Sequence, residues 1–198
     1  MPIMFENEIL KFKALNQLAE SNGTVIFGGA EDINIPLGEL KQAFALNDKI
    51  YNRSIAGLSA TDAATVYDEY VAELCPDTIL LHIGEADVSS FDGNEAAFEE
   101  GYRNLINAIR VKNKHTRIVV VPLKNDKNEA AVAKLNKTLS YIADSEKCEF
   151  EDISAKRVWN AKETRELTSF LYEIGFDKPL NIKRPIYNLV RILFCYAN

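Results

Sequence analysis

The chain has 198 residues, of which 47% are hydrophobic and 26% are charged, and its formal net charge at pH 7 is −6. This composition is typical of a soluble globular domain, and the length is sufficient to bury a hydrophobic core in a single unit covering residues 1–198. The negative charge disfavours nucleic acid and anionic membranes as partners, because their phosphate groups would be repelled.

Apolar runs and helical periodicity alternate along the chain. The continuous apolar run "DTILLHIG" is typical of a parallel strand covered on both faces. Ser59, with Asp62 three residues later, is a typical helix N-cap. The predicted strands cover 24–28, 49–55, 77–84, 117–123 and 148–154. The predicted helices cover 6–21, 37–46, 59–75, 94–112, 128–144, 160–174 and 185–196.

This alternation predicts an α/β fold with a mainly parallel sheet and helices on both faces. Right-handed crossovers leave few topologies, and we expect a three-layer α/β/α sandwich with the flavodoxin-like strand order 2-1-3-4-5. Ligands of such sheets bind beyond the carboxyl ends of the strands, where the strand order reverses. The loops "GGAEDI", "SIAGLSATD" and "GEADVSS" are therefore expected to share one crevice.

These loops resemble the motif blocks of the SGNH (GDSL-type) hydrolases, in which a serine follows the first strand. The matching segment here is Phe27-Gly28-Gly29-Ala30-Glu31, and either Ala30 or Glu31 takes the serine position, depending on the alignment. The second block resembles "NRSIAGLS", where Gly57 takes the place of the glycine whose backbone N–H holds the oxyanion.

The two remaining blocks of the resemblance also lack their functional side chains. "GEAD" follows the third strand and begins with Gly84, but Ala86 replaces the asparagine that donates to the oxyanion. In the last block Asp177 matches the acid and Leu180 stands where the histidine is expected. A serine needs an adjacent base to become nucleophilic, so the resemblance implies the fold without the serine-ester chemistry.

Few other side chains could replace this chemistry. His82 lies within the third strand, where a hydrogen-bonded packing role is favoured over catalysis, and His115 lies in a Lys/Asn-rich turn typical of solvated residues. Ser59 and Thr61 are better explained as capping residues, and Ser54 lies beside Gly57 without a GxSxG motif. No GxGxxG or GxxxxGK[ST] phosphate loop is present, although Gly28-Gly29 would let a ligand approach the backbone closely.

Four carboxylates are expected to lie close together at the mouth of this crevice, those of Glu31, Asp32, Glu85 and Asp87. Such loops can hold Mg²⁺ or Ca²⁺ or act as an acid/base pair, but they are more often solvated or helix-capping, and no DxDxDG-like spacing is present. The resemblance to the SGNH hydrolases implies that Asp87 braces the loops against one another. The crevice and ligand-binding residues predicted from the sequence are Gly29, Glu31, Asp32, Gly57, Gly84, Glu85 and Asp87.

The ends of the chain and its cysteines add further expectations. The segment "RPIYNLVRILFCYAN" is predicted to be a helix buried against the sheet, with a partner-docking or dimer surface as the alternative. The three cysteines lie far apart without a CxxC motif, the first residues do not resemble a signal peptide, and no apolar run reaches about 18 residues. These features predict a cytoplasmic protein without a metal, a cofactor or a membrane partner.

Three functions remain open from the sequence. The favoured hypothesis is a catalytically silent SGNH-like domain that binds a small molecule or a glycan, or serves as an interaction scaffold with an unidentified protein partner. The second is a divergent esterase or acylhydrolase that uses Glu31, Glu85 or Asp87. The third is an α/β interaction module whose crevice is vestigial.

Overall fold

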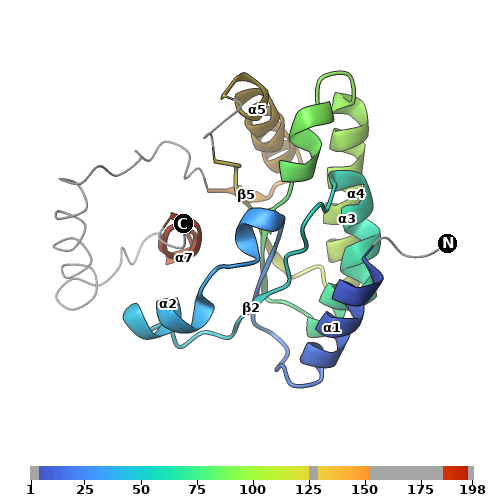
Figure 1. The fold of residues 1–198 in the computed structure, drawn as a ribbon. Coiled ribbons are helices and arrows are strands. Elements are labelled where there is room, and N and C mark those ends of the chain that lie inside the picture. The colour runs from blue at the N-terminus through green and yellow to red at the C-terminus, as the bar shows by residue number, and fades with distance from the viewer. Residues whose placement is uncertain (1–4, 125–128, 152–184, 196–198) are drawn as a thin grey trace, which may run out of the picture.

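The computed structural model describes residues 5–124, 129–151 and 185–195 (Figure 1). Its centre is a five-stranded sheet with the order β2-β1-β3-β4-β5, in which every neighbouring pair is parallel. The predicted strand order is therefore confirmed. The strands are β1 (Thr24–Gly28), β2 (Ile50–Asn52), β3 (Thr78–His82), β4 (Arg117–Val120) and β5 (Glu149–Phe150).

The central strands consist of apolar residues because both of their faces are covered by helices. Val25, Ile26 and Phe27 in β1 are fully buried, as are Leu80 and Leu81 in β3. The register of β1 and β3 places Gly28 opposite His82 at the carboxyl end of the pair. This register brings the loop after β1 next to the side chain of His82, the last residue of β3.

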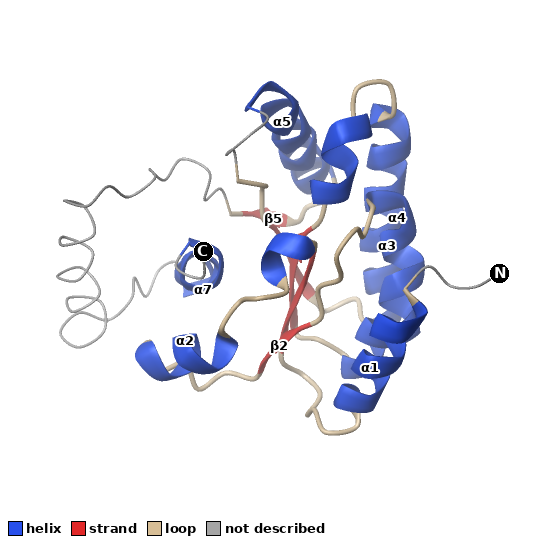
Figure 2. Ribbon diagram, in the orientation of Figure 1, coloured by secondary structure: helices blue, strands red, loops and turns tan. Residues whose placement is uncertain are grey.

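The helices lie on both faces of the sheet, which gives the predicted three-layer α/β/α sandwich (Figure 2). On one face lie α1 (Glu6–Asn16), α3 (Ala60–Val66), α4 (Glu95–Lys112) and α5 (Glu129–Ser145). On the other face lie α2 (Leu37–Ala43) and α7 (Pro185–Cys195). After α3 the chain continues through the π-helical turn η2 (Tyr67–Val71) and the 3₁₀ turn η3 (Ala72–Leu74). Two further 3₁₀ segments follow strands: η1 (Ala30–Asp32) comes after β1, and η4 (Glu85–Ser90) comes after β3.

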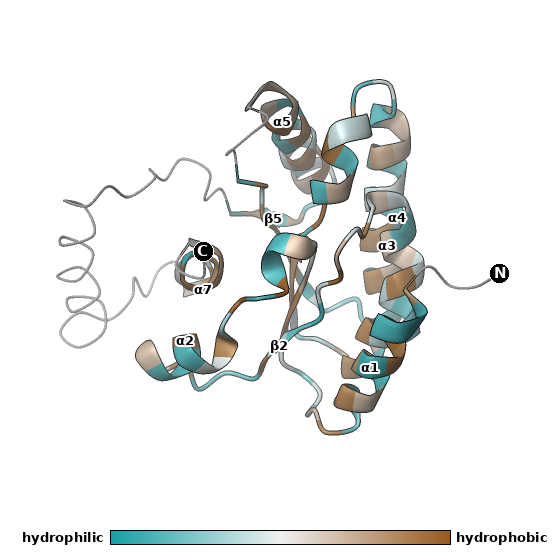
Figure 3. Cartoon of the chain, in the orientation of Figure 1, coloured by the Kyte–Doolittle hydropathy of each residue, from teal (hydrophilic) through white to brown (hydrophobic). Residues whose placement is uncertain are grey.

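Each face of the sheet has its own hydrophobic cluster, and the brown sides of the helices in Figure 3 mark where these clusters lie. The larger cluster joins Phe27, Ile79 and Leu81 to α3, α4 and α5. The smaller cluster joins Ile26 and Leu80 to α2 and α7. Since successive strand residues point to opposite faces, one strand supplies both clusters.

The C-terminal segment forms the buried helix that its apolar residues predict. Ile186, Val190, Leu193 and Phe194 are each at most 7% exposed and pack in the same cluster as Leu80. The alternative of a free docking face is therefore not supported for these residues. Among the helices that the structure describes, none is long and apolar enough to cross a membrane.

Some predicted boundaries differ from the observed ones. The first helix ends at Asn16 and not at residue 21, and Leu18 is 85% exposed, so its apparent helical periodicity does not reflect burial. β2 and β5 are shorter than predicted, with three and two residues respectively. The helix predicted at 160–174 lies outside the described residues.

Candidate functional site

The loops that follow β1, β2 and β3 meet at the carboxyl edge of the sheet, as the strand order predicts. The N–H of Gly28 donates to Ser54 Oγ over 3.1 Å, and the N–H of Ile55 donates to the carbonyl of Gly28 over the same distance. The N–H of Ala60 donates to Asp87 Oδ2 over 3.0 Å. These bonds join the three loops into one surface, here called the rim, which comprises residues 28–33, 54–60 and 84–90.

The two glycines at the end of β1 allow two carboxylates to approach the backbone. A Cβ atom built on Gly28 would lie 1.8 Å from Asp32 Oδ2, and one on Gly29 would lie 2.7 Å from Glu85 Oε2. The sequence suggested that these glycines let a ligand approach closely. The structure instead places the chain's own carboxylates there.

Asp32 and His82 form a buried pair between η1 and the end of β3. His82 Nδ1 lies 2.9 Å from Asp32 Oδ1 and 3.0 Å from Asp32 Oδ2, and each side chain is only 2% exposed. The imidazole ring packs edge to face against Phe194 of α7, with ring centroids 4.9 Å apart. His82 thus has the hydrogen-bonded packing role favoured from the sequence. The Asp32 side chain is buried below the surface of the rim and does not face solvent with the other carboxylates.

The charges around His82 favour its protonated form. Burial by itself lowers the pKa of His82, but the charge and hydrogen bond of Asp32 and the charge of Glu31 raise it, and Lys124 opposes them. The net effect raises the pKa of His82 above its ordinary value. The raised pKa favours an imidazolium beside the Asp32 carboxylate, and such a pairing compensates the charge that each group would otherwise bury alone.

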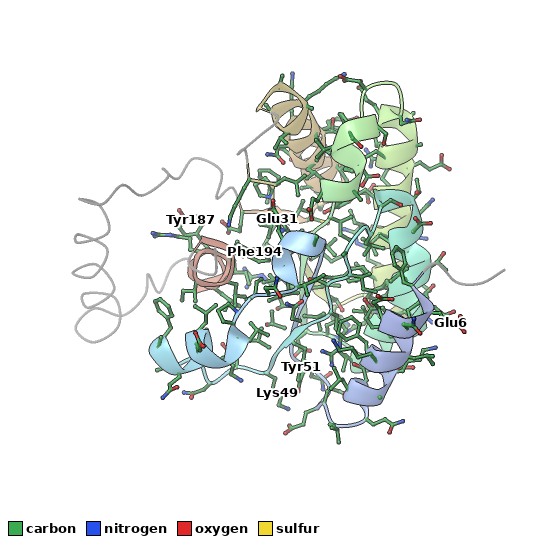
Figure 4. All side chains as sticks on the ribbon, in the orientation of Figure 1. Glu6, Glu31, Lys49, Tyr51, Tyr187 and Phe194 are labelled. Atoms are coloured by element: carbon green, nitrogen blue, oxygen red, sulfur yellow. The ribbon has the colours of Figure 1, made fainter. Side chains whose placement is uncertain are left out.

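Glu31 and Glu85 are adjacent carboxylates at the rim. The backbone N–H of Glu31 donates to Glu85 Oε2 over 3.2 Å, and the Glu31 side chain is exposed. Partial desolvation, together with the charges of Glu85 and Asp32, raises the pKa of Glu31, although His82 and Lys124 act in the opposite direction. Figure 4 labels Glu31 on η1 and Phe194 on α7, the neighbouring element that contacts His82.

Asp87 connects η4 to the first turn of α3. Besides its bond from Ala60, this carboxylate is half-buried, and desolvation raises its pKa while the N–H bond from Ala60 lowers it. Ser59 caps the same helix by accepting from the N–H of Asp62 over 3.3 Å. Asp87 therefore makes a bracing contact of the kind that the motif resemblance implies.

Of the remaining rim residues, Gly57 and Ala86 are exposed, whereas Gly84 is buried. Gly57 has a φ of +75° and nothing within 4 Å of the position its Cβ would occupy, and Ala86 is exposed. Gly84 has a φ of +137°, and a Cβ there would lie 3.1 Å from Leu135. Asp177 and Leu180, the positions matched to the last motif block, lie outside the described residues.

Among the described residues, the catalytic groups of a serine esterase are not assembled at the rim. Both histidines of the chain are described: His82 is buried, and His115 lies in the turn before β4, at the opposite edge of the sheet. Ser54 is 4% exposed and accepts a backbone N–H, and Ser59 caps α3. In the described ranges, no cluster of three or more potential metal-ligating side chains is found.

Sequence reasoning missed two features of this edge. Lys124 follows β4, and its charge acts on both Glu31 and His82. Its position directly after the strand "RIVVVPL" was the available signal, because the carboxyl ends of parallel strands share one edge. The Asp32–His82 pair depends on the strand register and has no local sequence signature.

Comparison with known proteins gives similarity in structure only. No protein-family model matches the chain, and no curated protein matches it in sequence. A protein from Streptococcus pneumonia described as a platelet activating factor shares the fold with a TM-score of 0.66 and 17% identity, over 98% of this chain and 92% of that one. A protein from Parabacteroides merdae described as a GDSL-like lipase has a TM-score of 0.55 and 15% identity, over 90% of this chain and 96% of that one.

A third similar structure is an acetylxylan esterase from Geobacillus stearothermophilus, with a TM-score of 0.52 and 18% identity, over 80% of this chain and 96% of that one. The architecture is thus a flavodoxin-like α/β/α sandwich. Within that class, the strand order and these neighbours show an SGNH (GDSL-type) hydrolase-like fold, as the motif resemblance predicts.

Proposed function

We propose that the protein is a catalytically silent SGNH hydrolase-like domain that binds a small hydroxyl-rich ligand, such as a glycan, at the rim. The observation that carries the proposal is the location of the two histidines. One is committed to Asp32 inside the fold, and the other lies at the far edge of the sheet. Neither can accept a proton from a nucleophile at the rim, and a serine hydrolase needs a base within hydrogen-bonding reach.

The replaced motif positions support the same conclusion. Ala30 has no group that can attack a carbonyl, and Ala86 has no side-chain donor for an oxyanion. Loss of one such donor commonly lowers the rate by about 10²–10³-fold, and here the nucleophile and the base are replaced as well. In this proposal the domain has the SGNH hydrolase-like fold but lacks the groups for serine-ester hydrolysis.

Binding is supported by the groups that remain accessible at the rim. Glu31 is exposed and Glu85 partly so, and both present carboxylate oxygens that accept hydrogen bonds from hydroxyl groups. Gly57 and Ala86 of the same rim are exposed, and a Cβ at Gly57 would meet nothing within 4 Å. One structural neighbour acts on acetylated xylan according to its description, which makes xylooligosaccharides the natural first probe.

A divergent hydrolase is the second candidate, because Glu31 has a raised pKa beside the carboxylate of Glu85. Two carboxylates whose pKa values differ can act as acid and base in hydrolysis. In this alternative Glu31 would be the proton donor and water the nucleophile. The exposure of Glu31 and the absence of a side-chain oxyanion donor at Ala86 weigh against it.

The test compares hydrolysis and binding in the same preparations. Wild type, Glu31→Ala and the control Glu39→Ala, an exposed glutamate on α2, are incubated with p-nitrophenyl acetate and acetylated xylooligosaccharides. We expect no turnover above the buffer rate in any of the three. Turnover that is lost in Glu31→Ala and retained in Glu39→Ala would establish the hydrolase alternative.

The binding part is tested by titrating isotope-labelled protein with acetylated and deacetylated xylooligosaccharides. Amide shifts confined to the rim, and weakened by Glu31→Ala but not by Glu39→Ala, are the expected result. Absence of any shift would reject the glycan as ligand, while the hydrolysis result would still decide whether the domain is silent.

A further inference from the structure

The pair Asp32–His82 links the rim to the C-terminal helix. On the rim side, the Asp32 backbone also takes part: its N–H donates to the carbonyl of Gly29, and its carbonyl accepts from Asn52 Nδ2 over 2.6 Å. On the other side, the His82 ring contacts Phe194 of α7. A single imidazole is therefore in contact with two elements that are far apart in the sequence.

The local sequence is adapted to this arrangement. The register places Gly28 opposite His82, and the Asp32 carboxylate reaches His82 by passing over Gly28. Any side chain at Gly28 would occupy the space of that carboxylate, since a Cβ there would be 1.8 Å from Asp32 Oδ2. The glycine at the end of β1 is thus explained by the pair itself.

We propose that His82 is a positioning residue for the rim: through Asp32 it fixes η1, which carries Glu31, and through Phe194 it joins that loop to α7, so that protonation of one imidazole stabilises both elements. The proposal goes beyond ligand binding, and rests on the proposed function only in taking the rim as the binding surface. The free protein can be used to test it, so its failure is distinguishable from a failure to bind glycans.

The charges that face His82 determine the direction of the effect. Asp32 and Glu31 of η1 favour the imidazolium, and Lys124 after β4 opposes it. β1 contributes the uncharged Gly28 and α7 contributes the Phe194 ring, while the one charged side chain of α7, Arg191, lies over Tyr187.

Since the folded-state pKa of His82 is raised, the stabilisation is fully present below the unfolded value of about 6.5. The stabilisation is lost as the pH rises through the folded value. Loss of the imidazolium leaves the buried Asp32 carboxylate without its counter-charge. Both η1 and α7 are therefore expected to loosen over the same pH range, the range in which His82 loses its proton.

The experiment measures the side-chain titration of His82 by NMR, and amide hydrogen exchange as a function of pH after correction for the intrinsic exchange rate. In wild type, His82 should titrate above the ordinary value of about 6.5. Exchange in residues 29–33 and 186–194 should rise by about tenfold over the pH range in which His82 loses its proton. The control His115→Asn should leave this profile unchanged.

Asp32→Asn keeps a hydrogen-bonding group but removes the charge, so the pH-dependent rise in exchange should disappear from both segments and His82 should titrate at lower pH. If this variant does not fold, Phe194→Leu serves instead. It should speed exchange in residues 186–194 at every pH and preserve the pH-dependent rise in residues 29–33.

Three results would overturn the proposal. One is titration of His82 at or below the ordinary value of about 6.5. Another is a rise in only one of the two segments in wild type. The third is an unchanged rise in Asp32→Asn or, where that variant does not fold, loss of the rise in residues 29–33 in Phe194→Leu.

Discussion

The loops after β1 and β3 occupy equivalent places at the carboxyl edge of the sheet, and each contains an aspartate, but the two aspartates are held differently. Asp32 turns onto the face of the sheet, is 1% exposed and is paired with His82. Asp87 stays at the rim, half-buried, and accepts the backbone N–H of Ala60. The comparison shows that one loop is fixed by a side-chain charge and the other by a helix N-terminus.

The difference has a steric origin in the residues before each loop. The backbone of β1 ends in Gly28, which leaves room for a carboxylate over the strand. β3 ends in His82, whose ring fills the corresponding space on the α7 side. A carboxylate can be buried at the first strand end because the second strand end supplies its counter-charge.

The largest effect is expected from Gly28→Ala, since a Cβ there would lie 1.8 Å from Asp32 Oδ2 and 2.9 Å from the carbonyl oxygen of His82. The added methyl must displace the Asp32 carboxylate, so we expect the free energy of unfolding to fall by about 3 kcal/mol. Urea unfolding measures the change. The matched control Gly38→Ala lies in α2 with nothing within 4 Å of its Cβ and should stabilise slightly. Equal effects at both glycines would show that the pair does not constrain β1.

A smaller effect is expected from pH acting on His82. The free energy of unfolding of the wild type should decrease as the pH rises above about 6.5, by about 1.4 kcal/mol for each unit by which folding raises the pKa. His82→Gln should remove this part of the pH dependence, whereas His115→Gln should retain it. A stability that increases with pH over this range would contradict the assignment of an imidazolium to His82.

The third change, Asp87→Ala, tests the other aspartate. Removing the acceptor leaves the N–H of Ala60 unpaired in a partly buried position, so a loss of about 1 kcal/mol is expected. Asp87→Asn should cost less, because the amide oxygen still accepts the bond and the charge that burial disfavours is gone. If both variants lose the same stability in urea unfolding, the charge and not the hydrogen bond holds η4.

The smallest effect is expected from Glu31→Gln, which changes neither aspartate. Glu31 is exposed, so the free energy of unfolding should change by less than about 0.5 kcal/mol. Its direction should be neutral or stabilising, since the raised pKa of Glu31 means that its surroundings disfavour the charge. A loss comparable to that of Asp87→Ala would show that Glu31 supports the rim rather than facing a ligand.

The sequence by itself determined the order of the strands, the edge at which the loops meet and the burial of the C-terminal helix. These features follow from local patterns. The apolar run through Leu80 and Leu81 marks a strand covered on both faces, and the apolar face of α7 marks a helix packed against the sheet. The pattern failed for Leu18, because periodicity alone does not show where a helix ends.

Only the tertiary structure decided which of the carboxylates are buried and which groups they pair with. Asp32 and His82 are 50 positions apart, and whether they meet depends on the register that sets Gly28 opposite His82. Asp32 and Glu31 are adjacent acidic residues, and no local sequence pattern indicates which of them is buried. In the structure Asp32 is buried and Glu31 is exposed. Local patterns encode which face of an element is buried, whereas the pairing of two charges depends on distances that only the assembled sheet defines.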